Sequence, residues 1–196
     1  TIQDAAGNTV TSDNTTVVAF AKASGLGTVG GTGTDTAAAG VATKTVTGEL
    51  AGTVNMAATS AGLTDGTLSF AVVHGPAADI VLSGSTADLA SGDNRVLTAT
   101  LKDAAGNTVT SDNSTVVTFA KASGAGTVTG TGTDTAAAGV ASKAVTGALI
   151  GSVTMQATAT GLTTGTLGAF TVVHGAAAQI DLTGATANLT SGATRL

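Results

Sequence analysis

Short stretches in which apolar and polar residues alternate recur along the chain. Arg95–Lys102 (RVLTATLK) places two leucines and an alanine on one side and threonines on the other. A period of two is typical of a β-strand with one buried face. Similar patterns predict further strands at Asp79–Ser83, Thr115–Ala120, Gly139–Val145, Gly151–Thr160 and Thr166–His174. No stretch has helical periodicity, and the alanine runs are too short to hold a helix.

Turn signals separate these stretches at intervals of roughly 8–12 residues, a pattern typical of β-sandwiches. Asp103–Asn107 (DAAGN) predicts a tight turn, in which the Asp103 carboxylate caps the backbone while Gly106 and Asn107 tolerate positive φ. Ser123–Thr135 alternates glycine and threonine and predicts a loop with a weak, exposed strand. We therefore predict an all-β fold of sandwiches, each with about seven antiparallel strands.

The pattern occurs twice. Asp4–Asn14 (DAAGNTVTSDN) is identical to Asp103–Asn113, and Phe20 is equivalent to Phe119. A repeat of about 100 residues is too long for a solenoid unit, so each copy can hold its own core. The predicted organisation is a sandwich unit lacking its first strands at 1–75, a complete unit at 76–175, and the first strand of a following unit at 176–196.

The ends of the chain are unequal. The first unit lacks the segment equivalent to 79–99, whereas 176–196 aligns with 76–96. An incomplete sandwich exposes core and an unpaired strand edge, and an added strand would repair both. Two explanations are open: a window from a longer tandem chain, which we favour, or separate subunits joined head to tail by strand addition. Both place Ile180 and Leu182 in a sandwich other than that of 77–174.

The repeat also predicts the cores and the junction. Phe119 should be buried against the strand that carries Val153 and Met155, and their equivalents in the first unit should pack in the same way: Phe20, Val54 and Met56. Pro76, the only proline, fixes φ in the short connection between the units. Adjacent units should therefore stack end to end with limited bending.

Composition excludes several functions. A net charge of −5, with only seven scattered Lys and Arg residues, disfavours nucleic acid and anionic membranes as partners. No window is apolar enough for membrane insertion of this segment. The absence of Cys excludes a disulfide framework.

The order of motifs resembles the bacterial immunoglobulin-like domains of the invasin and intimin type (group 1). The motifs are Thr98–Asp103, the D-x-x-G-N turn Asp103–Asn107, Val117–Phe119, Asp134–Ala141 and Gly151–Ala157, and most recur in the first unit. The resemblance implies that the sandwiches are immunoglobulin-like and form tandem repeats of a surface adhesin or fibre protein. It carries over no ligand, because recognition in such proteins usually lies in a separate tip domain.

Candidate chemical sites are few. His74 and His174 stand alone in identical VVHG contexts, where we expect strand ends rather than metal ligands or bases. Gly30–Asp35 (GGTGTD) matches a calcium motif that works only when repeated. Asp103 with Asn107, and equally Asp4 with Asn8, could supply half a calcium site at a domain boundary, but the turn already accounts for them.

A threonine ladder along 127–135 could order water, but one exposed strand explains it as well. With two lone histidines and no Cys, we expect no enzyme and predict no catalytic, cofactor-binding or metal-binding residues.

The predicted function is that of an extracellular, cell-surface or secreted tandem repeat that forms a stalk, fibre or filament for bacterial surface projection or adhesion. Its predicted partners are neighbouring repeats of the same protein, with a head-to-tail homopolymer as one form. The alternative is a carbohydrate- or calcium-binding β-sandwich module, although sugar platforms usually use Trp or Tyr, which the chain lacks.

Overall fold

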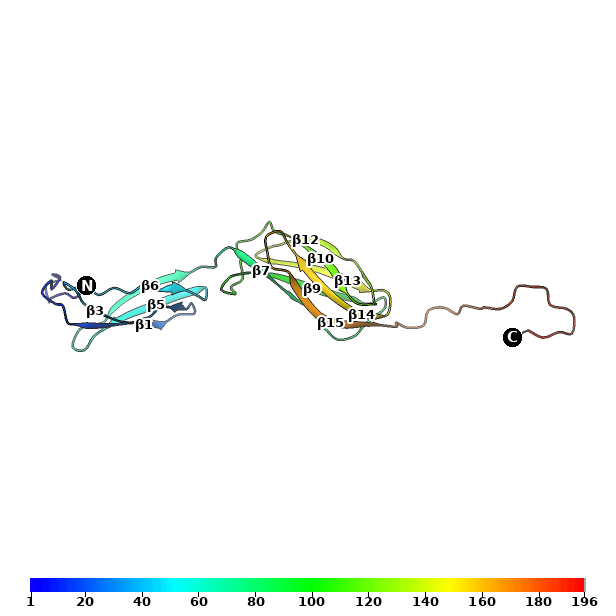
Figure 1. The fold of residues 1–196 in the computed structure, drawn as a ribbon, viewed down its shortest axis with the longest axis horizontal. Helices are drawn as coiled ribbons and strands as arrows, with labels where there is room; N and C mark the ends of the chain where they lie inside the picture. Colours follow the sequence, from blue (N-terminus) through cyan, green and yellow to red (C-terminus); the bar gives the residue numbers. More distant parts are fainter. Residues whose placement is uncertain (196) are drawn as a thin grey trace.

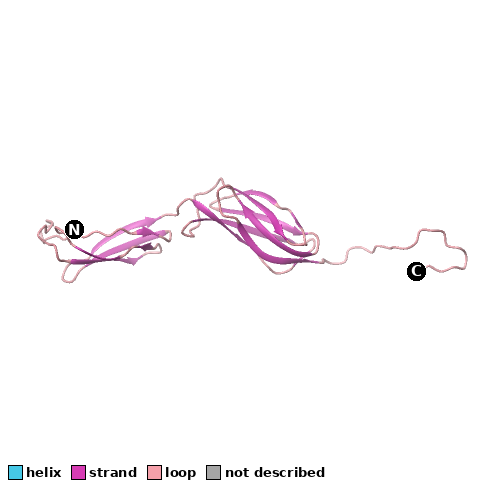
Figure 2. Ribbon diagram, in the orientation of Figure 1, coloured by secondary structure: helices cyan, strands magenta, loops and turns pink. Residues whose placement is uncertain are grey.

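A computed structural model describes residues 1–195 of the chain, and within these residues the regular secondary structure consists entirely of β-strands (Figure 2). Two β-sandwich-like bodies follow one another along the chain, and an extended segment trails from the second (Figure 1). We refer to residues 1–75 as the first unit, 76–175 as the second unit and 176–195 as the tail. The all-β fold predicted from the alternating pattern is confirmed.

The second unit contains two sheets. Its strands are β7 (Ala77–Ser83), β8 (Leu89–Ala90), β9 (Asn94–Asp103), β10 (Val116–Ser123), β11 (Val128–Thr129), β12 (Gly132–Thr135), β13 (Val140–Gly147), β14 (Gly151–Thr158) and β15 (Gly165–Val173). One sheet has the order β12-β10-β14-β15-β8 and the other the order β11-β13-β9-β7. All pairings are antiparallel except that of β8 with β15, which is parallel and departs from the predicted all-antiparallel arrangement.

The core of the second unit lies between these sheets. Leu97, Ala99 and Leu101 of β9 are fully buried, as their alternation with threonine predicts. Phe119, 1% exposed, lies on β10 opposite Ala157 of β14, the strand that carries Val153 and Met155, and both of these are also fully buried. Facing side chains from both sheets thus exclude water between the layers, as in other β-sandwiches.

The first unit has one main sheet. Its strands are β1 (Val17–Ser24), β2 (Val29–Gly30), β3 (Gly33–Thr36), β4 (Thr47–Gly48), β5 (Gly52–Thr59) and β6 (Gly66–Val72). The order β3-β1-β5-β6 repeats that of β12-β10-β14-β15, and β2 pairs only with β4. The described chain supplies no equivalent of β7 and β8, and of β9 only the stretch Thr1–Asp4. One layer of this unit is therefore largely uncovered.

The glycine- and threonine-rich run does not form one ladder. β11 belongs to one sheet and β12 to the other, so the chain crosses between the layers near Gly130. Gly130 has a φ of 77°, a left-handed conformation that glycine adopts without a steric penalty. The threonines between 127 and 135 consequently do not share one continuous face, and two short strands stand where a loop with one weak, exposed strand was predicted.

The tail makes no strand between residues 176 and 195. Ile180 and Leu182 are 97% and 93% exposed, so neither packs beside Phe119. Part of the tail nevertheless has local order that matches the second unit. The Arg195 guanidinium donates to the Ala187 carbonyl, just as Arg95 donates to the Ala87 carbonyl at 2.6 Å.

Candidate functional site: an open sheet face and a unit junction

The inner face of the first unit's sheet is open. Phe20 is half-buried, whereas its equivalent Phe119 is only 1% exposed. Leu68 is 65% exposed, whereas Leu167 is 6% exposed. The prediction that Phe20 is buried like Phe119 is therefore wrong for this chain, because the second sheet that covers Phe119 has almost no counterpart here.

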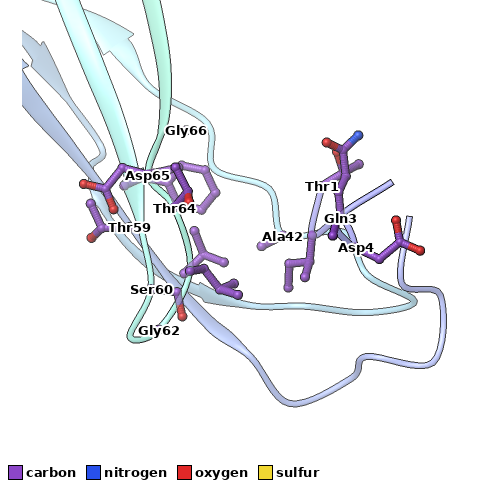
Figure 3. Close-up of a pocket in the computed structure, with 16 residues that line it drawn as sticks. Thr1, Gln3, Asp4, Ala42, Thr59, Ser60, Gly62, Thr64, Asp65 and Gly66 are labelled. Atoms are coloured by element: carbon purple, nitrogen blue, oxygen red, sulfur yellow. The ribbon is translucent and has the colours of Figure 1, made fainter. Parts of the chain in front are cut away.

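Two hollows mark this open face. One has a volume of about 580 Å³ and lies between Thr1–Ala5 and the Thr59–Gly66 turn (Figure 3). The other, of about 320 Å³, is lined mainly by apolar atoms, including those of Phe20, Met56 and Leu68. Phe20 and Gly66 line both hollows, so the two adjoin at the edge where β6 begins.

In the second unit, strand β7 occupies the equivalent position. The Ile80 N–H donates to the Thr163 carbonyl at 3.1 Å, and the Thr163 N–H donates to the Ala78 carbonyl at 2.9 Å. The chain passes so close to Gly165 that a Cβ there would lie 2.6 Å from the Ile80 carbonyl oxygen. At the equivalent Gly66 the nearest atom, the Ala58 Cβ, would be 3.9 Å away. The open face of the first unit thus has the shape that β7 fills in the second.

The junction between the units is built from polar groups. The Gly75 N–H donates to Asp103 Oδ2 at 2.7 Å. Asn107 uses both ends of its amide: Oδ1 accepts from the Ala51 N–H at 2.8 Å, and Nδ2 donates to the Glu49 carbonyl at 2.8 Å. We call these three hydrogen bonds the junction clip. They join the D-x-x-G-N turn of the second unit to the backbone of the first.

The Asp103 carboxylate is held ionised by its surroundings. The Gly75 N–H is the strongest of the donors that lower the pKa of Asp103 to about 2, followed by the Asn107 side chain and the Asn107 and Ala105 N–H groups, while burial acts in the opposite direction. Hydrogen bonds to an ionised carboxylate favour the charged form. The pKa of Asp4 is also lowered, chiefly by the Asn8 side chain and the Asn8 N–H.

The predicted turn role of these residues is therefore supplemented by a docking role. Asp103 and Asn107 are 4% and 6% exposed, whereas Asp4 and Asn8 are exposed. This second role was not predicted from the turn itself, because both turns have identical sequences and only the neighbouring unit distinguishes them. The HGPAAD connection was the available signal, since it brings the two units within hydrogen-bonding distance.

The histidines lie just beyond strand ends, where the sequence placed them. His74 is half-buried, with Nδ1 2.9 Å from the Gly75 carbonyl oxygen, and His174 is exposed. No group of three or more Asp, Glu or His side chains within residues 1–195 is arranged to hold a metal ion. Within the same residues, no helix is long and apolar enough to cross a membrane.

Comparison with known proteins gives a class of fold and no family. No protein-family model matches the sequence, and no curated protein matches it. The D00-D0 domain of intimin matches at a TM-score of 0.50 with 17% identity, over 80% of this chain and 84% of the other. This match supports an all-β arrangement of consecutive immunoglobulin-like domains.

Two further structures match less closely. Domains 4 and 5 of the S-layer protein SbsC match at a TM-score of 0.36 with 18% identity, over 88% of this chain and 78% of that one. A β-glycosidase from Bacteroides vulgatus matches at 0.45 with 12% identity, over 81% of this chain and 21% of the enzyme. The chain thus spans about a fifth of the length of that glycosidase.

Proposed function

We propose that this chain is a structural segment of a bacterial surface stalk, fibre or filament, in which each sandwich is completed by strands of a neighbouring repeat. The role is mechanical rather than catalytic: it spaces or links other parts of a surface protein. The fold shared with intimin domains supports the class of module. The proposal extends to location, outside the cell, and to partners, which are repeats of the same sequence.

The difference between the two units is the observation that carries this proposal. In the second unit, β7–β9 cover the inner face of the main sheet, whereas the nearly identical face of the first unit is uncovered. The tail has a sequence equivalent to that of β7 and β8, with Ile180 and Leu182 in the places of Ile80 and Leu82. Ile80 and Leu82 are buried in the second unit, so the exposed tail pair matches an unfilled position in the first.

The occupant we propose for the open face is therefore a strand of this repeat. A synthetic peptide of residues 77–99 carries the segment that the first unit lacks and ends one residue before Thr100, the equivalent of Thr1. Added to the full chain, it should bind the first unit and bury Phe20 and Leu68. It should also raise the melting temperature of that unit, because ligands that bind only the folded state stabilise it.

Two matched changes make the test specific. At the equivalent Gly165 a Cβ would lie 2.6 Å from the Ile80 carbonyl oxygen, so Gly66→Ala should weaken peptide binding without destabilising the free unit. A peptide with Leu82→Asp and Leu97→Asp should not bind, because both side chains are buried in the second unit. Equal binding by the Gly66→Ala chain, or no binding of the wild-type peptide, would contradict strand completion.

The competing class is a carbohydrate- or calcium-binding module. A glycan array probed with the full chain, and melting curves with calcium and with EDTA, distinguish the two classes. A mechanical repeat should show no specific glycan and no calcium-dependent shift. Specific binding of one glycan by the second unit would replace the proposal with a recognition function.

A further inference from the structure

The D-x-x-G-N turn of the first unit has the conformation of a docked turn without a docked neighbour. Asp4 Oδ1 accepts from the Ala6 N–H at 3.0 Å and from the Asn8 N–H at 2.9 Å. The equivalent distances at Asp103 are 3.0 Å and 2.8 Å. The contacts from Asn8 Nδ2 to the two Asp4 oxygens, 3.3 and 3.1 Å, are also the same as those from Asn107 to Asp103.

Because the carboxylate already holds the amide, docking requires little rearrangement. Preorganised groups lose less conformational entropy when they bind. The Asn8 amide retains Oδ1 as a free acceptor and one Nδ2 hydrogen as a donor, since its other contacts are to Asp4. These are the two functions that Asn107 uses in the junction clip.

The complementary loop is also present at the far end of the second unit. Ala148–Ile150 is equivalent to Glu49–Ala51 and has the same internal bonds. The Ala148 N–H donates to the Thr127 carbonyl at 2.9 Å, and the Leu149 N–H donates to Thr127 Oγ1 at 3.0 Å. In the first unit the Glu49 N–H and Leu50 N–H make the same bonds with Thr28, also at 2.9 and 3.0 Å.

Side-chain differences between the loops leave this match intact. Asn107 contacts only the carbonyl of Glu49 and the N–H of Ala51, and both groups are backbone. Replacement by Ala148 and Ile150 therefore preserves the bonding groups. The Ser91 hydroxyl already donates to the Ala148 carbonyl at 2.8 Å, but a carbonyl oxygen has a second lone pair.

The loop also exposes apolar surface. Leu149 and Ile150 are 66% and 65% exposed. They directly precede Gly151, which pairs with Val172 near the end of β15, so the loop lies close to the point where the tail departs. The residue equivalent to Ile150 in the first unit is Ala51, which is only half-buried within the occupied junction. A neighbour seated in the same way would cover part of Ile150 and make polar bonds, whereas Leu149 would stay largely exposed, as Leu50 is 50% exposed in the occupied junction.

We propose that the turn Asp4–Asn8 is a docking site whose partner is the Ala148–Ile150 loop of a second copy of this chain, joined by a repeat of the junction clip. Asn8 would bind the Ala148 carbonyl and the Ile150 N–H, and Asp4 would accept from the Gly175 N–H. This inference rests on the proposed function in one respect. The tail that leaves Gly175 would be directed to the open face, as the chain that leaves Gly75 is directed into β7.

Nuclear magnetic resonance on the full chain tests this proposal, because the same chain contains one docked and one undocked copy of the turn. The side-chain amide of Asn107 reports the docked state and that of Asn8 the free state. As unlabelled chain is added to ¹⁵N-labelled chain, the Asn8 side-chain amide should move towards the Asn107 position. The Ile150 backbone amide should move towards that of Ala51 over the same concentrations.

Two single substitutions provide the matched pair. Asn8→Ala removes the free docking group and should weaken self-association roughly tenfold or more, because two hydrogen bonds are lost. Asn107→Ala removes the same group from the occupied turn and should leave self-association unchanged while altering the Gly75 and Ala51 amides. Equal self-association of the wild-type and Asn8→Ala chains would overturn the proposal.

The outcome also separates this inference from strand completion. If the copies associate with changes at Met56 and Leu68 but none at Asn8 or Ile150, the open face binds a strand and the docking site is refuted. If Asn8 does not shift at chain concentrations up to about 1 mM, a clip between copies is likewise refuted. In that case the peptide of residues 77–99 still decides strand completion.

Discussion

The two units have nearly the same sequence but differ in structure, so comparing them isolates the effect of tertiary contacts. The segment after Gly139 (VASKAVTG) forms β13, an eight-residue strand paired with β9. The segment after Gly40 (VATKTVTG) differs at two positions, yet only Thr47–Gly48 is a strand. Sequence preference is almost the same in both, so the presence of β9 as a partner decides whether the strand forms.

The strands of the covering sheet also decide which residues form a core. Val54 remains fully buried even in the open unit, because neighbours within its own sheet and loops cover it. Leu68 and Phe20 lie nearer the edge that β7 covers in the second unit, and both are more exposed than their equivalents. The first unit thus has the residue pattern of a complete sandwich but only one of its two main sheets. Its lower stability relative to the second unit should be measurable.

Hydrogen exchange should show the largest difference. Amides of Val140–Gly147 are held in the β13–β9 ladder and should exchange only by large-scale unfolding, whereas those of residues 41–46 should exchange by local fluctuation. We expect the two sets to differ by about a thousandfold or more, since global stabilities begin near 5 kcal/mol. Comparable rates at residue-by-residue resolution would show that the first unit is closed in solution.

Truncation of the core phenylalanines should give the second-largest difference between the two units. Phe119→Ala should destabilise the second unit by about 3–5 kcal/mol, because it empties a fully enclosed site. Phe20→Ala should cost clearly less, because its ring already contacts solvent. Urea denaturation that follows resonances of each unit separately measures the two free energies of unfolding. Equal destabilisation by the two substitutions would contradict the difference in burial between Phe20 and Phe119.

A pair of glycine substitutions tests the geometry of the missing strand. Gly165→Ala would force a Cβ to within 2.6 Å of the Ile80 carbonyl and should cost about 1–3 kcal/mol by displacing β7. Gly66→Ala meets only ordinary contacts and should be neutral or slightly stabilising. Thermal melts of the two variants provide the comparison, and a tolerated Gly165→Ala would contradict the position of β7.

Acid should have the smallest effect, and at the junction it acts through Asp103. The folded-state pKa of Asp103, about 2, lies below its ordinary value of 3.8, so its contribution is complete above pH 3.8. That contribution is lost as the pH falls from 3.8 through 2. The Gly75 amide resonance should titrate over this range in the wild-type chain and remain unchanged in Asp103→Asn.

Asp4 is the internal control for this titration. It has the same turn bonds but lacks the contact from a preceding glycine N–H, so it should protonate at a higher pH than Asp103. Carboxyl ¹³C shifts of the two residues measure both events in one sample. If Asp4 and Asp103 titrate together, the Gly75 bond does not hold the junction.

Much of the architecture was readable from the residues alone. Alternation located Leu97, Ala99 and Leu101 on a buried face, and the duplication showed that two units share one plan. The D-x-x-G-N turn was also predictable, since its carboxylate and glycine act within a few residues of each other. Local rules are sufficient where the interacting groups are close in the sequence.

Only the tertiary structure distinguished residues of identical type. Asn8 and Asn107 have the same neighbours in sequence, but one is exposed and the other binds a loop more than 50 residues away. Phe20 and Phe119 likewise differ only in what lies opposite them. Burial and docking depend on non-local partners, whose presence an alternating pattern does not encode, and these contacts separate a closed unit from an open one.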